Sequence, residues 1–219
     1  MMLRTMIVLG ILLVGTAAAQ KNDWLIVPGQ RVGPITAATT RADLDTLFGT
    51  DNVHDGSFDS SEVPEAATVV FGNDTSAALA VTWDKERAST IHICFGTQSG
   101  PCRWRTASGI RIGLPLMELQ KLNGKPFQLA GYGFDGQGEV TSWRHGMLEE
   151  APAVCGHLVV RLSPAAEVEG RSMSKHESNS LKQAQGDKPY SSGNPLILDL
   201  NPFVSALELQ FTGPGCASK

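Results

Sequence analysis

The sequence lacks the local signatures of several common enzyme and metal classes. It contains no Cys-x-x-Cys pair, which zinc and redox sites use, and no Gly-x-Ser-x-Gly turn, which carries the nucleophile of many hydrolases. Its histidines include no pair at the i, i+4 spacing of a helical zinc site: His54, His92, His145, His157 and His176. Paired catalytic carboxylates leave no such signature, so the sequence does not exclude an enzyme of that type.

The sequence also has no large excess of charge of one sign and, beyond its first residues, no long apolar run. The chain has 18 basic and 22 acidic residues and a formal net charge of -4, which does not resemble the basic footprint of a nucleic-acid or anionic-lipid binder. Beyond residue 19, no stretch approaches the roughly 20 apolar residues that a membrane helix needs. We therefore expect no nucleic-acid partner and no membrane span.

The N-terminus has the three parts of a secretory signal peptide. Arg4 lies in a short basic region, an apolar run covers Met6 to Val14, and small residues end at Ala19. We expect cleavage near Ala19, so that residues 1–19 are removed. The protein is then exported, and is periplasmic or secreted.

Four cysteines follow this segment. An even number of cysteines in an exported protein predicts two disulfides, although three pairings are possible. We favour Cys94–Cys102, because a turn-rich segment separates the two residues, which leaves Cys155–Cys216 to fasten the C-terminal tail.

Two segments resemble each other at an offset of 75 residues. Residues 35–49 and 110–124 share an isoleucine, an acidic residue, two leucines and a glycine, and each predicts a short strand or loop followed by a helix that stops at the glycine. Chance is the alternative explanation of five coincidences. Strand-like runs follow each helix: 67–71, 77–83, 90–95, 127–134, 139–144, 157–162 and 204–211.

This pattern predicts an α+β fold in which helices pack on an antiparallel sheet, built as two tandem related halves. The halves would cover residues 20–104 and 105–219. Within the second half, residues 170–193 are polar and have no apolar periodicity, so we expect an insertion in the form of a long loop.

An acidic stretch partly matches a 12-residue calcium loop. Oxygen-bearing side chains occupy four positions of that loop, with Gly56 at the sharp turn: Asp51, Asp55, Asp59 and Glu62. Val53 stands where a third-position oxygen ligand is expected, and a solvated acidic turn is the alternative. Calcium is the one cofactor that we consider; otherwise we expect none.

Two tryptophans have arginine neighbours. Trp104 lies between Arg103 and Arg105, and Trp143 precedes Arg144. Exposed tryptophan and arginine side chains anchor many protein interfaces, so these five residues are candidate binding residues. The alternative is that each tryptophan is buried in the sheet, with the arginine stems packed alongside.

Two motifs carry a family resemblance. The Thr-x-x-Asp-Leu-x-x-x-Phe-Gly pattern of residues 40–49 and the Phe-Asp-Gly-x-Gly-x-Val pattern of residues 134–140 resemble small exported domains of the β-lactamase-inhibitor-protein and SmpA/OmlA type. The resemblance implies helices against an antiparallel sheet, in some members twice with disulfides, and binding through a protein surface. The chain departs from the SmpA/OmlA pattern because no cysteine stands directly after the expected cleavage site, where those proteins carry their lipid anchor.

These observations predict an exported, disulfide-bonded binding or envelope-interaction module with a protein partner. The alternative is a periplasmic hydrolase with its site between the two halves.

Overall fold

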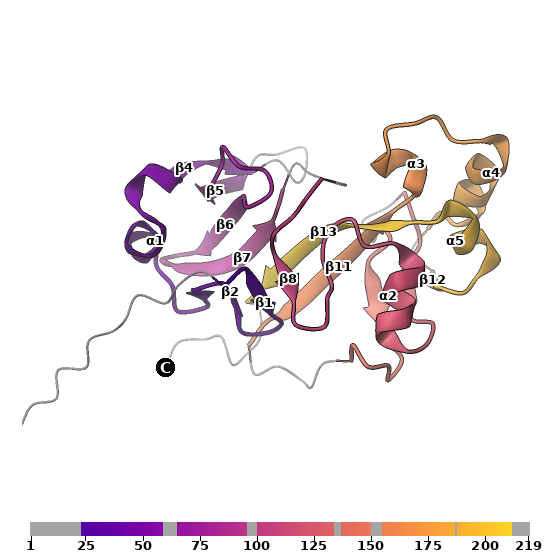
Figure 1. Cartoon of the computed structure of the whole chain (residues 1–219), viewed down its shortest axis with the longest axis horizontal. Helices are drawn as coiled ribbons and strands as arrows, with labels where there is room; N and C mark the ends of the chain where they lie inside the picture. The colour runs from indigo at the N-terminus through magenta and orange to yellow at the C-terminus, as the bar shows by residue number, and fades with distance from the viewer. Residues whose placement is uncertain are drawn as a thin grey trace, which may run out of the picture.

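The computed structural model describes residues 23–58, 65–95, 100–133, 137–149, 155–186 and 188–211 (Figure 1). The predicted signal segment lies outside the described residues. Among the residues that the structure describes, no helix is long and apolar enough to cross a membrane. Helices accompany antiparallel and mixed sheets, which confirms the α+β fold class.

The first structural unit is a helix followed by a four-stranded meander. A capping box between Thr40 and Asp43 starts the helix, and Gly49 ends it. Each strand pairs antiparallel with the next. The elements are α1 (Arg41–Phe48), the 3-10 turn η1 (Thr50–Asn52), β4 (Val53–Phe58), β5 (Glu65–Val70), β6 (Leu79–Asp84) and β7 (Arg87–Ile93).

The second unit repeats this order. It consists of α2 (Leu116–Asn123), β9 (Gln128–Ala130), β10 (Val140–Ser142), β11 (His157–Ser163) and β13 (Phe203–Gln210). β9 pairs with β10 and β11 with β13, and a bridge between Glu139 and Arg161 joins β10 to β11. α2, β9 and β10 each begin 75 residues after α1, β4 and β5. The offset seen in residues 35–49 therefore continues through two strands.

The two meanders join through their last strands. β13 pairs antiparallel with β7, from Leu207 opposite Ile93 to Gln210 opposite Thr90. The resulting six-stranded sheet has the order β11-β13-β7-β6-β5-β4 and runs across the middle of the molecule (Figure 1). β9 and β10 of the second unit belong to a separate three-stranded sheet of order β10-β9-β12. The predicted boundary at residue 104 thus divides the chain within one continuous sheet.

One face of this sheet carries the core. Ile91 and Ile93 of β7 and Leu207 and Leu209 of β13 lie in a single apolar cluster with residues of both units. That cluster includes Leu44 of α1 and Leu119 of α2, each with no exposed surface. Alternation along the strands sends the intervening residues, such as His92 and Glu208, to the opposite face. We call this the far face.

The polar segment 170–193 is not a loop. Between β11 and β13 the chain forms α3 (Ala165–Val168), α4 (Lys175–Gln183), β12 (Pro189–Ser191) and α5 (Pro195–Leu200). Ser174 and Glu177 form a capping box that starts α4, and β12 pairs with β9. The loop prediction was wrong because α4 buries only Ser180 and so has no apolar stripe to detect.

A small four-stranded sheet has three strands before α1 and one after β7, and only the short strand or loop at the start of residues 35–49 was predicted. Its strands are β1 (Leu25–Val27), β2 (Arg31–Val32), β3 (Ile35–Thr36) and β8 (Arg105–Thr106). β1 lies parallel to β8, which ties the start of the described chain to the segment that follows the first meander.

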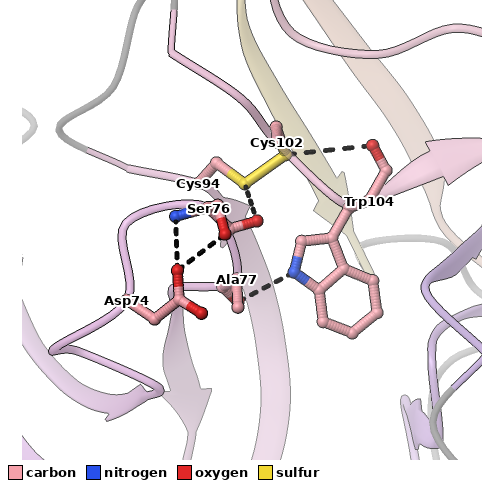
Figure 2. The surroundings of a disulfide bond; sticks show 6 residues. All are labelled: Asp74, Ser76, Ala77, Cys94, Cys102 and Trp104. Atoms are coloured by element: carbon pink, nitrogen blue, oxygen red, sulfur yellow. Dashed lines mark hydrogen bonds between the residues drawn. A yellow bond between two sulfur atoms is a disulfide. The ribbon is translucent and has the colours of Figure 1, made fainter.

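The Cys94–Cys102 disulfide is present as predicted. The two Cα atoms are 6.0 Å apart, and the disulfide lies beside the Asp74–Ala77 turn (Figure 2). Cys155 is also disulfide-bonded. Its predicted partner, Cys216, lies outside the described residues.

Candidate functional site

Trp104 lies in the core, which corrects the prediction that it belongs to a binding surface. Its side chain has no exposed surface, and its indole N–H donates to the Ala77 carbonyl at 2.8 Å (Figure 2). Its ring packs edge-on against Trp24, with centroids 4.9 Å apart. A side chain buried in this way stabilises the fold and presents no surface to solvent.

The two arginines next to Trp104 in the sequence have different surroundings. Arg103 lies 5.1 Å from the Trp24 ring centroid and forms an ion pair with Asp74 at 2.7 Å. Arg105 is exposed at the start of β8. The burial of Trp104 matches the alternative interpretation, whereas Arg103 lies over the Trp24 ring instead of alongside Trp104.

The backbone conformation of the acidic stretch contradicts the calcium-loop prediction. Residues 53–58 form the strand β4, which extends the chain where a calcium loop must fold around the ion. The Asp55 carboxylate accepts hydrogen bonds from Arg41 at 2.6 Å and Thr68 at 2.9 Å. Asp51 is exposed in η1, whereas Asp59 and Glu62 lie outside the described residues. Within the described ranges, no group of three His, Cys, Asp or Glu residues could hold a metal ion.

Trp143 and Arg144 begin a short surface loop after β10, residues 143–149, which we call the 143–149 loop. Trp143 is half-buried and packs edge-on against Phe127, with ring centroids 5.2 Å apart. Arg144 is exposed. The structure therefore brings these two predicted residues into one feature, and places Trp104 elsewhere.

Asn123, the last residue of α2, holds this loop in place. The side chain is fully buried, and its Nδ2 group donates to the carbonyls of Lys125 at 2.9 Å and Trp143 at 3.0 Å. Its Oδ1 atom accepts from the Leu148 amide at 3.2 Å. The backbone carbonyl of Asn123 accepts from the Met147 amide at 2.8 Å. The amide group thus fixes both ends of the loop to the helix.

The loop backbone is strained as well as fixed. Arg144 and His145 have φ values of 55° and 58°, so two consecutive side chains adopt the left-handed region, which costs about 1 kcal/mol or more each. A Cβ atom on Gly146 would lie 2.0 Å from the Asn123 Oδ1 atom, so only glycine fits there. Strain of this kind persists where surrounding contacts impose it, and it concentrates at functional sites.

Four side chains of the loop are exposed: Arg144, His145, Met147 and Glu149. Arg144 and His145 are exposed, and neither side chain makes a hydrogen bond to another described residue. Met147 is 81% exposed at the rim of a hollow of about 250 Å³ whose lining includes Ile26 and Ile110. A large apolar side chain this exposed beside an apolar hollow is a feature of interaction surfaces.

The seam between the two units, where the hydrolase alternative predicts a site, holds an ion network on the far face. Arg161 forms ion pairs with Glu208 and, at 3.3 Å, with Glu139; His92 Nδ1 lies 3.5 Å from the Glu208 carboxylate. Burial alone would raise the pKa of Glu208, but the hydrogen bond from His92 and the charge of Arg161 lower it to about 2. Such a weak base is poorly matched to proton transfer near neutral pH.

Comparison of the chain with protein-family models, curated proteins and solved structures finds no match. We therefore infer function from the geometry of the site itself. The sequence pointed to Trp143 and Arg144 through their residue types. Asn123, His145 and Met147 were missed, and the one signal for Asn123 was the Asn-Gly pair that ends α2.

Proposed function

We propose that this protein is an exported, disulfide-bonded binding module that recognises a protein partner through the 143–149 loop. The observation that carries the proposal is a fixed, strained loop from which Arg144, His145 and Met147 face solvent. Methionine and arginine are enriched at the centres of protein interfaces.

The rigidity of the loop favours binding. A flexible loop loses conformational entropy when it docks, whereas a loop already fixed by Asn123 loses little. The exposed side chains also indicate what the partner's surface contains. The partner provides an apolar pocket for Met147 and a carboxylate for Arg144, whose guanidinium pairs well with such a group.

Export is part of this proposal. Disulfides persist in oxidising compartments, and residues 1–19 have the pattern of a signal peptide. The resemblance to β-lactamase-inhibitor-protein and SmpA/OmlA domains supports it further, because that resemblance implies a repeated helix-and-sheet unit that binds proteins. A helix followed by two strands recurs in this chain at an offset of 75 residues.

A crosslinked pull-down from an envelope and secretion extract of the source cells tests the proposal. The bait is the oxidised protein, compared with the double variant Arg144→Ala, Met147→Ala. The matched control is Arg105→Ala, Met117→Ala, which removes another exposed arginine and a methionine that is 55% exposed on α2. We expect one stoichiometric partner with wild type and control, and about a hundredfold weaker capture with the loop variant.

Equal capture by the loop variant and wild type contradicts the proposal, as does the absence of any stoichiometric partner. Unchanged melting temperatures of both double variants exclude unfolding as the cause of a loss. The variant Gly146→Ala provides a second test, because it retains Arg144 and Met147 but cannot keep the loop conformation. It should weaken capture although no contacting side chain is removed.

A further inference from the structure

A cavity of about 570 Å³ lies between the start of α1 and the strands β4, β5 and β6. Its volume is within the range of about 300 to 1,000 Å³ typical of small-molecule sites. It is formed by the first unit, whereas the 143–149 loop belongs to the second. We call it the α1 cavity. Six side chains give it its chemistry: Arg41, Asp55, Thr68, Trp83, Lys85 and Glu86.

A chain of hydrogen bonds fixes the walls of the α1 cavity. The indole N–H of Trp83 donates to the Thr68 hydroxyl at 3.1 Å, and that hydroxyl donates to Asp55 Oδ1 at 2.9 Å. The same carboxylate oxygen accepts from Arg41 Nε at 2.6 Å. An aromatic ring, a carboxylate and a guanidinium on three different elements are therefore held in one arrangement before any ligand arrives.

Within these hydrogen-bonded side chains, one donor group and one acceptor atom stay unused. Arg41 donates through Nε to Asp55 and through Nη1 to Asp45, while its Nη2 group has no acceptor among the described residues. Asp55 Oδ2 likewise has no donor in the described part of the chain. One donor group and one acceptor atom thus remain for a ligand.

The turn between β6 and β7 adds a second pair of charges. Lys85 and Glu86 line the cavity and are exposed, and neither side chain has a hydrogen-bond or ion-pair partner among the residues described. The lining thus holds two cations and two anions, with the apolar surfaces of Trp83, Ala42 and Ala66. A balanced lining does not favour a ligand with only one sign of charge, since either sign meets an equal number of like charges.

We propose that the α1 cavity binds a small zwitterion with an apolar body, of the class of the apolar and aromatic α-amino acids. The ligand's carboxylate pairs with Arg41 and Lys85. Its ammonium group pairs with Asp55 and Glu86, and its side chain packs on the Trp83 ring. The volume accommodates one such molecule with water or a dipeptide, and the fixed walls reduce the entropic cost of binding.

Three probes of matched shape test the charge pattern. L-phenylalanine has both charges, 3-phenylpropanoate has only the carboxylate, and phenethylamine has only the ammonium group. Each is titrated into the full chain while the Trp83 indole N–H resonance is followed by NMR, with the buried Trp104 resonance as internal reference. We expect phenylalanine to shift the Trp83 resonance and to bind about tenfold more tightly than either single-charge probe.

Variants assign the binding to this cavity. Lys85→Gln and Glu86→Gln each remove one exposed charge that has no described partner, so neither should affect folding. Each should weaken phenylalanine binding about tenfold, whereas Lys125→Gln, an exposed lysine outside the cavity, should not. Absence of any shift of the Trp83 resonance overturns the proposal. Equal affinity for the three probes, or phenylalanine binding unaffected by Lys85→Gln and Glu86→Gln, overturns it as well.

Discussion

Replacing Glu208 by glutamine should remove a large part of the stability that the seam network contributes. The Glu208 side chain is 12% exposed on β13 and contacts Arg161 of β11 and His92 of β7. Burial opposes its ionisation, yet the hydrogen bond from His92 and the charge of Arg161 lower its pKa from 4.5 to about 2. One pKa unit corresponds to about 1.4 kcal/mol, so the folded state favours the charged form by about 3 kcal/mol.

The sign of this linkage fixes its pH dependence. Because the pKa is lower in the folded state, the stabilisation is fully present above about pH 4.5, the ordinary pKa of the group. It is lost as the pH falls from there towards about 2. Glu208→Gln should therefore cost about 3 kcal/mol near neutral pH and progressively less in acid.

Urea unfolding followed by tryptophan fluorescence, at a series of pH values from about 7 down to about 3, measures the effect. Glu65→Gln is the matched control, because Glu65 is an exposed glutamate at the start of β5 whose side chain has no hydrogen bond or ion pair among the described residues. It should change stability by less than about 0.5 kcal/mol. The reasoning is refuted if Glu208→Gln costs no more than the control at neutral pH, or if its cost is the same at every pH.

Three further changes test the packing of the fold, each by urea unfolding. The double variant Cys94→Ser, Cys102→Ser should lose about 2.5 kcal/mol, the loop-entropy value for this short loop. Tyr132→Phe should be neutral or stabilising by up to about 1 kcal/mol, because the buried hydroxyl has no partner among the described residues. Trp104→Phe should cost about 2 kcal/mol through the lost bond to Ala77 and the lost volume, and should leave partner capture unchanged.

Local signals made the repeated helices predictable. The capping residue Thr40 and the glycines at 49 and 124 mark helix ends through contacts within one turn, which depend on the nearest residues alone. β4 was missed because Val53 is the one residue on it with a buried side chain among those described, so the strand has no apolar alternation. Its partner β5, not its own composition, makes this segment a strand.

The candidate site was predictable only in part, for a different reason. Trp104 is buried with its indole bonded to Ala77, 27 residues earlier in the chain. Each tryptophan is followed by an arginine, so residue types alone could not separate Trp104 from Trp143. The left-handed conformations of Arg144 and His145 are not preferences of those residue types. They follow from the contacts of Asn123, which join the end of α2 to a loop 20 residues away.

The position of β13 explains how a surface loop can be held rigidly. β13 is a central strand, paired with β11 on one side and β7 on the other. At its start, the Val204 amide donates to the Leu114 carbonyl at 2.9 Å, and the first amide of α2, at Leu116, donates to the Pro202 carbonyl at 2.8 Å. α2 is therefore fastened to the middle of the sheet, and Asn123 at its far end fastens the 143–149 loop to α2. A continuous set of hydrogen bonds thus connects the loop to the strand on which both meanders depend, so the loop can keep its strained backbone for as long as the sheet stays folded.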